Sequence, residues 1–136
     1  MKNQLMIITI VITLCSMLIG CSRSGGSTDL KEGGIYCFKN VNGAYSVLKI
    51  LKVESGGLHI RVYSNQFDSP PTKVDESTLY MAGRNPKPNE ILSEPDVALL
   101  KKSFDTYKAT FVQQSTVKDD ELEVYKTWKQ AGGKYY

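Results

Sequence analysis

A run of β-prone residues between two turn signals sets the strongest limit on the fold of this 136-residue chain. The run extends from Ala44 to Glu54, with Asn42-Gly43 before it and Ser55-Gly56-Gly57 after it. Asn and Gly tolerate the positive φ that tight hairpin turns require. Apolar residues occupy both parities of the run, so we expect a central, bent strand that is covered on both faces.

Shorter β-prone segments flank this run on both sides. One strand is expected to begin at Ile35 and end at Asn40. In the other, apolar and polar residues alternate: Leu58, His59, Ile60, Arg61, Val62 and Tyr63. Alternation of this kind predicts a strand with one face packed inward and one polar face. The three segments together predict an antiparallel meander, and their layout from Gly33 to about Asn65 resembles a small SH3-like or Tudor-like barrel.

Further elements are expected along the rest of the chain. They are a strand within 74–82, a helix through 93–101, a strand over 107–117 and a helix over 119–131. Paired or spaced prolines assign 66–73 and 83–90 to loops. The predicted fold class is therefore α+β and mainly β: a small antiparallel meander or SH3-like barrel with a docked C-terminal helix.

Two local signals support the predicted helices. Ser93 is placed as the N-cap of the first helix, with Pro95 and Asp96 in its first turn. The second helix carries Leu122, Tyr125 and Trp128 at a spacing of three residues, which predicts that this side docks on the sheet.

The N-terminal part of the chain has the pattern of a secretory signal. Lys2 is followed by an apolar run from Leu5 to Ile19. At about 15 residues, the run is shorter than the roughly 18 that a transmembrane helix needs. We therefore expect a signal peptide that is cleaved from the mature protein.

The residues Leu18-Ile19-Gly20-Cys21 at the end of this run resemble the lipobox of bacterial lipoproteins. The resemblance implies cleavage after Gly20 and a lipid on Cys21, which would anchor the protein to the cell membrane. Ser22 follows the cysteine, and by the same resemblance it indicates the periplasmic face of the outer membrane if the organism is Gram-negative. An uncleaved anchor helix, or an ordinary signal with a coincidental cysteine, is the alternative.

These features predict three parts of the chain. Residues 1–20 are the signal peptide, residues 21–32 a flexible tether rich in Ser and Gly, and residues 33–136 a single globular domain. Of the three cysteines, Cys15 leaves with the signal and Cys21 takes the lipid. Cys37 then has no disulfide partner, and we expect it to be a buried small hydrophobe, although a nucleophile or an intermolecular bridge is also open.

Charge and motifs exclude several function classes. The chain has 17 basic and 14 acidic residues, with both signs interspersed, which is not the pattern of a nucleic-acid binder. His59 is the only histidine, and no partner stands at a metal-ligand spacing from it. No phosphate-binding glycine loop or nucleophile elbow is present. We predict no metal, no cofactor and no catalytic residue.

The polar strand residues His59, Arg61 and Tyr63 form the one candidate binding face. Arg61 would supply a planar fork and Tyr63 a hydroxyl for an anion or a partner carboxylate. A solvated outer face with no function is the simpler interpretation. Acid–base chemistry by Cys37 and His59 would require their strands to bring them together.

Three functions follow from the sequence. The first is a lipid-anchored, non-catalytic envelope module that binds a protein or cell-wall component. The second is a periplasmic immunity or inhibitor lipoprotein, and the third is a small hydrolase that uses His59. A binder should expose an apolar or aromatic patch, whereas an enzyme should place His59 in a deep pocket.

Overall fold

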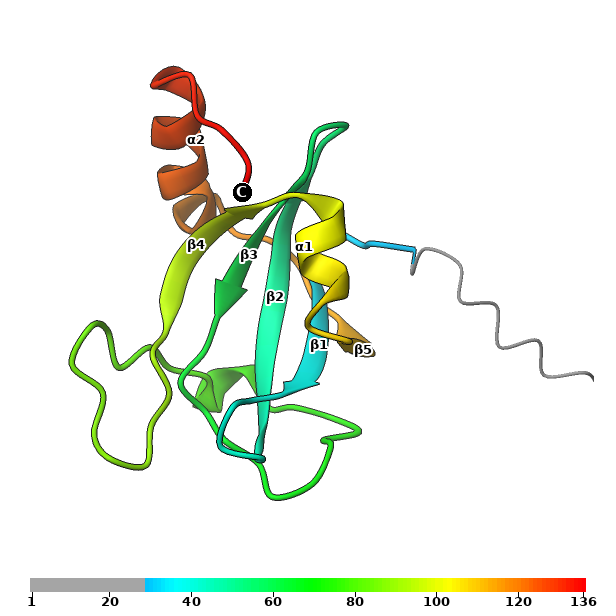
Figure 1. Ribbon diagram of the computed structural model, residues 1–136, viewed down its shortest axis with the longest axis vertical. Coiled ribbons are helices and arrows are strands. Elements are labelled where there is room, and N and C mark those ends of the chain that lie inside the picture. The colour runs from blue at the N-terminus through cyan, green and yellow to red at the C-terminus, as the bar shows by residue number, and fades with distance from the viewer. Residues whose placement is uncertain (1–28) are drawn as a thin grey trace, which may run out of the picture.

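The computed structural model describes residues 29–136 (Figure 1). The predicted signal peptide, the lipobox and Cys21 lie outside the described residues, as does most of the predicted tether.

Within residues 29–136, five antiparallel strands form one sheet in the order β4-β3-β2-β1-β5 (Figure 1). The strands are β1 (Gly34–Lys39), β2 (Tyr45–Val53), β3 (Leu58–Val62), β4 (Glu94–Leu99) and β5 (Thr110–Gln114). The first three form the predicted meander, β4 pairs with β3, and β5 pairs with β1. The predicted fold class, α+β and mainly β, is confirmed.

Both turns of the meander depend on glycine. Gly43 has a φ of 85° and donates its N–H to the carbonyl of Asn40 at 3.0 Å. A side chain would be strained at that φ, so the Asn42-Gly43 signal is explained. In the second turn, Gly57 lies directly against the carbonyl of Leu99 and the ring of Tyr135, which leaves no space for a Cβ atom.

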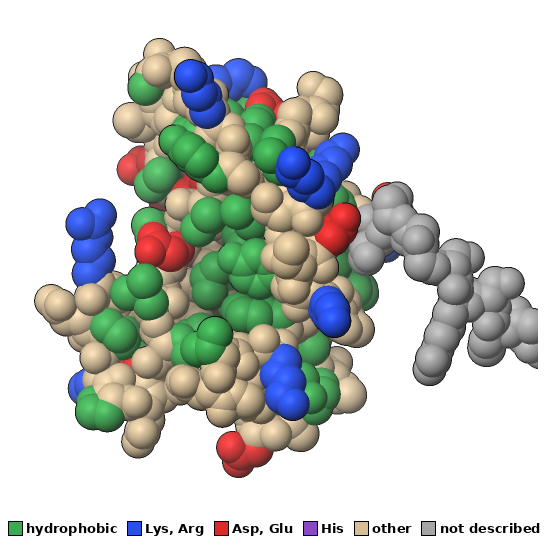
Figure 2. Space-filling view, viewed as in Figure 1, with side chains coloured by type: hydrophobic (Ala, Val, Ile, Leu, Met, Phe, Trp, Pro, Cys, Tyr) green, Lys and Arg blue, Asp and Glu red, His purple; other side chains and the backbone are tan. Residues whose placement is uncertain are grey.

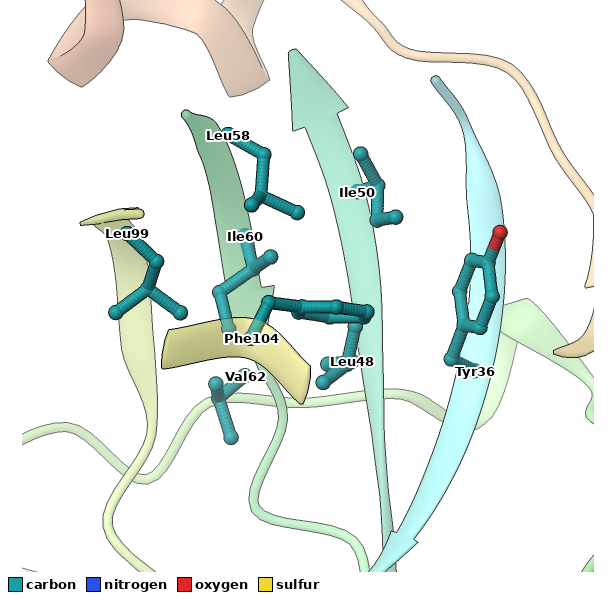
Figure 3. Packing of buried hydrophobic residues seen from close by; sticks show 8 residues of the cluster. All are labelled: Tyr36, Leu48, Ile50, Leu58, Ile60, Val62, Leu99 and Phe104. Carbon is teal, nitrogen blue, oxygen red and sulfur yellow. The ribbon is translucent and has the colours of Figure 1, made fainter. Parts of the chain in front are cut away.

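One face of the sheet carries the main apolar core (Figure 3). Its buried members are Tyr36, Leu48, Ile50, Leu58, Ile60, Val62, Leu99 and Phe104. Phe104 comes from the short helix α1 (Lys101–Asp105), which crosses this face between β4 and β5. Its ring meets that of Tyr36 edge to face, with centroids 6.0 Å apart. Burial of each such side chain contributes about 1.5–3 kcal/mol.

The opposite face of the sheet is covered as well, and this explains the apolar residues on both parities of β2. Near one end, Ile35, Cys37, Val47, Tyr63 and Val74 form a second buried cluster. The predicted burial of Cys37 is confirmed. Elsewhere on this face the chain after β5 packs against β2 and β3.

The predicted helix through residues 93–101 is wrong, because residues 94–99 form β4. Val97 stands opposite Ile60, and Leu99 stands opposite Leu58. The capping signal at Ser93 is a local effect worth about 1 kcal/mol. Pairing with β3 instead satisfies the backbone groups of that strand's open edge and buries Leu99, so the tertiary contact overrides the local signal.

The predicted strand within 74–82 is also wrong. The 3₁₀ turn η1 (Glu76–Thr78) occupies part of this segment. The carboxylate of Asp75 accepts the backbone N–H of Ser77 at 3.0 Å, which turns the chain away from an extended conformation. In the part of the chain that the structure describes, no strand pairs with this segment.

The last two predicted elements are confirmed. The strand expected over 107–117 is β5, and the helix expected over 119–131 is a 3₁₀ turn, η2 (Asp119–Leu122), that continues into α2 (Glu123–Gln130). Gly132, with a φ of 68°, ends α2. None of the helices among residues 29–136 is long and apolar enough to cross a bilayer.

Trp128 docks α2 on the sheet, although it is partly exposed. Its ring centroid lies 4.4 Å from that of His59 and 4.8 Å from that of Tyr135. We expect Trp128→Ala to lower the free energy of unfolding by about 3 kcal/mol, the lower end for loss of a large aromatic ring, because the ring is not fully buried.

The matched control is Val124→Ala on the same helix, where the side chain is 44% exposed. This change should alter the free energy of unfolding by less than about 0.5 kcal/mol. Urea denaturation of a fragment beginning at residue 28 measures both effects. Equal midpoints for the two variants would show that the Trp128 ring does not hold the helix.

Candidate functional site

The three candidate residues do share one face of the sheet, opposite the main core. His59 and Arg61 belong to β3, and Tyr63 follows it directly. Leu58, Ile60 and Val62 point to the other face, where they join the main core. The face that carries the candidates is not a solvated outer surface, because the segment from Thr116 to Tyr136 packs over much of it.

His59 is fully buried inside the protein. Its Nδ1 lies 2.6 Å from a carboxylate oxygen of Asp96 on β4, and that carboxylate is also buried. Three aromatic rings surround the imidazole: Tyr125, Trp128 and Tyr135, with centroids 4.4 to 5.4 Å away. No substrate can reach the ring while the C-terminal segment is in place.

Sequence reasoning missed Asp96, because it assigned this residue to the first turn of a helix. The correct signal was present in the alternation of Asp96 with Val97 and Leu99, but it was weaker than the capping pattern. Within residues 29–136, His59 Nε2 and the second oxygen of Asp96 have no hydrogen-bond partner. The pair therefore makes no hydrogen bond to a hydroxyl or a thiol of residues 29–136.

Cys37 and His59 are not brought together. Cys37 belongs to the buried cluster with Val47, Tyr63 and Val74, whereas His59 lies among the rings of the C-terminal segment. Burial raises the pKa of the Cys37 thiol, which disfavours the thiolate that a nucleophile requires.

Glu54 binds two of the three aromatic residues that surround His59. Its carboxylate accepts the hydroxyls of Tyr125 at 2.5 Å and Tyr135 at 2.6 Å, and it pairs with the ammonium of Lys129 at 2.8 Å. These hydrogen bonds, that of Lys129 foremost, lower the pKa of Glu54 from 4.5 to about 2. Glu54 thus joins the end of β2 to α2 and to the chain's last residues.

A buried ion network lies beside Arg61. Lys49 on β2 is almost fully buried, and its ammonium lies 2.8 Å from the carboxylate of Glu121. The same carboxylate accepts a hydrogen bond from Arg61 at 3.3 Å and from the backbone N–H of Lys118 at 2.8 Å. Arg61 also donates its Nε–H to the carbonyl of Pro95 at 3.1 Å. Arg61 is therefore held in one position.

Arg61 and Tyr63 open onto a polar hollow of about 370 Å³, which we call the basic cavity. Its lining residues are Lys49, Arg61, Tyr63, Glu76, Ser77, Leu79, Lys118 and Glu121. Burial above all, with the nearby charge of Glu121, raises the pKa of Tyr63 to about 12. A tyrosine hydroxyl is protonated at neutral pH even at its ordinary pKa of about 10, so this group is a donor.

The lining of the basic cavity carries one positive charge in excess, from Lys49, Arg61 and Lys118 against Glu76 and Glu121. Its two carboxylates are already engaged: Glu121 by the ion network, and Glu76 by the hydroxyl of Ser115 at 2.6 Å. By contrast, the Lys118 ammonium has no hydrogen-bond partner among the described residues, and the Arg61 guanidinium lies beside the Tyr63 hydroxyl. Together with the Tyr63 hydroxyl, these donors suit a carboxylate.

Residues 29–136 contain no group of three or more His, Cys, Asp or Glu side chains that could hold a metal ion.

The lowered pKa of Glu54 predicts a pH-dependent stability. The charged carboxylate stabilises the folded state fully above pH 4.5, and this contribution is lost as the pH falls toward about 2. Glu54→Gln should therefore be less stable than wild type at neutral pH, and the difference should shrink over that interval. Urea midpoints of both proteins against pH measure it. A constant difference would contradict the assigned role of Glu54.

Comparison of the chain with known proteins identifies no relative. No protein-family model matches the chain, and no curated protein or solved structure matches it either.

Proposed function

We propose that this chain is a lipid-anchored cell-envelope protein whose folded domain is a non-catalytic binding module. Its partner is a protein or cell-wall component that presents a carboxylate to the basic cavity. An enzyme or toxin neutralised by an immunity or inhibitor lipoprotein would be one partner of this kind.

The anchor is supported by Leu18-Ile19-Gly20-Cys21 and the apolar run before it. A lipid on Cys21 would hold the domain at the membrane, because each buried methylene contributes about 0.8 kcal/mol and two chains suffice for stable anchoring. The Ser- and Gly-rich composition after Cys21 is that of a short tether, which would have a root-mean-square reach under about 20 Å. The partner would therefore be met close to the membrane surface.

The observation that carries the binding role is the fixed position of Arg61 at the basic cavity. Its contacts with Pro95 and Glu121 orient the guanidinium before a ligand arrives. A pre-oriented side chain loses little conformational entropy on binding. Lys118 and Tyr63 add a second charge and a hydroxyl donor at the same cavity.

The enclosure of His59 favours binding over the hydrolase alternative. A histidine that acts as a general base must reach the proton that it abstracts. Here Nδ1 of His59 is hydrogen-bonded to the carboxylate of Asp96. The rings of Tyr125, Trp128 and Tyr135 surround the imidazole. Its contacts are those of a residue that joins β3, β4 and α2, which suits a structural role.

Lipidation is tested by metabolic labelling with radioactive palmitate. Wild-type protein should incorporate the label, and the Cys21→Ala variant should lose it, since the sulfur carries the lipid. Cys37→Ala serves as the control and should retain the label, because that thiol is buried in the domain. Label that persists in the Cys21→Ala protein would disprove the anchor.

Binding through the basic cavity is tested with the pair Tyr63→Phe and Lys118→Gln. Both changes remove donors and leave the ion network intact, because Lys118 contributes only its backbone N–H to Glu121. Loss of one charge-assisted contact, worth about 1.5–3 kcal/mol, should weaken partner capture by at least about tenfold. Capture is measured by sedimentation with purified cell-wall sacculi and by pull-down from detergent-solubilised envelopes.

The matched control is Lys126→Gln on the exposed side of α2, which removes the same charge away from the basic cavity. Its capture should equal that of wild type. If the double variant at Tyr63 and Lys118 binds as well as this control, the basic cavity is not the binding site.

A further inference from the structure

A second hollow lies at another part of the domain and has no role in the proposed function. We call it the aromatic cavity; its volume is about 850 Å³. It is bordered by the end of β1, the turn after α1, the start of β5 and the loop that contains Pro70 and Pro71. Small-molecule sites in proteins typically have volumes of about 300–1,000 Å³.

The walls of the aromatic cavity are largely apolar. Phe38 and Tyr107 meet edge to face, with ring centroids 5.2 Å apart. Phe111, on the edge strand β5, also lines the cavity and is 41% exposed. Phe38 and Tyr107 are partly buried against the main core, and the Phe111 ring also meets that of Tyr36 with centroids 5.4 Å apart, so Phe111 is the exposed ring of the three.

An adjoining apolar hollow of about 440 Å³ extends this surface toward β4. It shares Phe38, Lys39, Thr106 and Tyr107 with the aromatic cavity, and it adds apolar side chains such as Ile91 and Val97 together with the carboxylate of Glu94. Figure 2 shows hydrophobic side chains gathered in the middle of the face that carries β4 and α1, with both basic and acidic side chains around it. A ligand with an extended apolar body therefore has a continuous surface to cover.

The charge of the aromatic cavity has one sign. Among its described lining residues the charged side chains are Lys39 and Lys108, with no carboxylate. The ammonium of Lys31 adds a third positive charge nearby, 5.2 Å from the centroid of the Phe111 ring. An acidic group on the ligand would complement these lysines, whereas a cationic group would be repelled.

Lys108 lies on the rim of the aromatic cavity, in the turn that follows α1. Its φ is 49°, in the left-handed region that costs an ordinary residue about 1–2 kcal/mol and favours Gly or Asn. A residue in this region commonly ends a helix, and here the N–H of Lys108 donates to the carbonyl of Asp105 at 3.1 Å at the end of α1. The strained backbone here places a lysine at the cavity.

We propose that the aromatic cavity binds an amphipathic organic anion, a small molecule with an apolar body and a carboxylate head. The body packs on Phe38, Tyr107 and Phe111, and the head pairs with Lys39 and Lys108. This site is separate from the basic cavity and does not depend on the anchored-module proposal.

The experiment uses full-length protein in detergent and a photoreactive probe, decanoate with a diazirine in its alkyl chain. After irradiation and proteolysis, mass spectrometry locates the modified residues. We expect labelling on peptides that contain Phe38, Tyr107 or Phe111, and we expect excess unlabelled decanoate to suppress it. A diazirine probe with the same chain and an ammonium head should label these peptides at least about tenfold less, the difference expected for loss of one charge-assisted contact.

Lys39→Gln combined with Lys108→Asn tests the head group from the protein side. Both side chains are exposed, and Asn tolerates the left-handed backbone, so the fold should be retained. Decanoate labelling should fall by about tenfold or more, while Lys101→Gln on α1 should leave it unchanged. Two results with the wild-type protein alone would overturn the proposed anion site. One is equal labelling by the carboxylate and ammonium probes, and the other is labelling that excess decanoate does not suppress.

Discussion

The buried ion pair between Lys49 and Glu121 is the constraint on which the second face of the sheet depends. The two residues are 72 positions apart, and both are almost fully buried. Removal of one partner from such a pair typically costs about 3–5 kcal/mol, because the other charge is left without compensation. Lys49 also donates to the carbonyl of Thr116 at 2.6 Å. The pair therefore fixes where the chain crosses the sheet after β5.

The path of the chain across the sheet determines which side chains of β3 a ligand can reach. It brings α2 over β3, where Tyr125, Trp128 and Tyr135 enclose His59, and where Glu54 binds both tyrosine hydroxyls. It also leaves Arg61 half-buried at the border of the basic cavity. The same packing thus removes the histidine from solvent and presents the arginine. The aromatic cavity lies elsewhere, between β5 and the proline loop, and is independent of this arrangement.

Local patterns determined the elements whose structure is set by near neighbours. Asn42-Gly43 and Ser55-Gly56-Gly57 indicated both hairpin turns, since few residues adopt the backbone that tight turns need. Alternation in β3 predicted which side chains share a face. The acidic first turn and the spacing of Leu122, Tyr125 and Trp128 predicted the last helix. The chain by itself was therefore sufficient for the meander, the docked helix and the burial of Cys37.

Tertiary structure alone decided the features that depend on distant partners. Residues 94–99 became β4 because the edge of β3 needed backbone partners, and this outweighed the capping signal at Ser93. The polar residues of β3 were predicted from alternation, but alternation carries no information on what covers a face. Asp96 beside His59, and Glu121 beside Lys49 and Arg61, come from segments far along the chain. Long-range contacts of this kind form only when the whole domain packs, so no local pattern contains them.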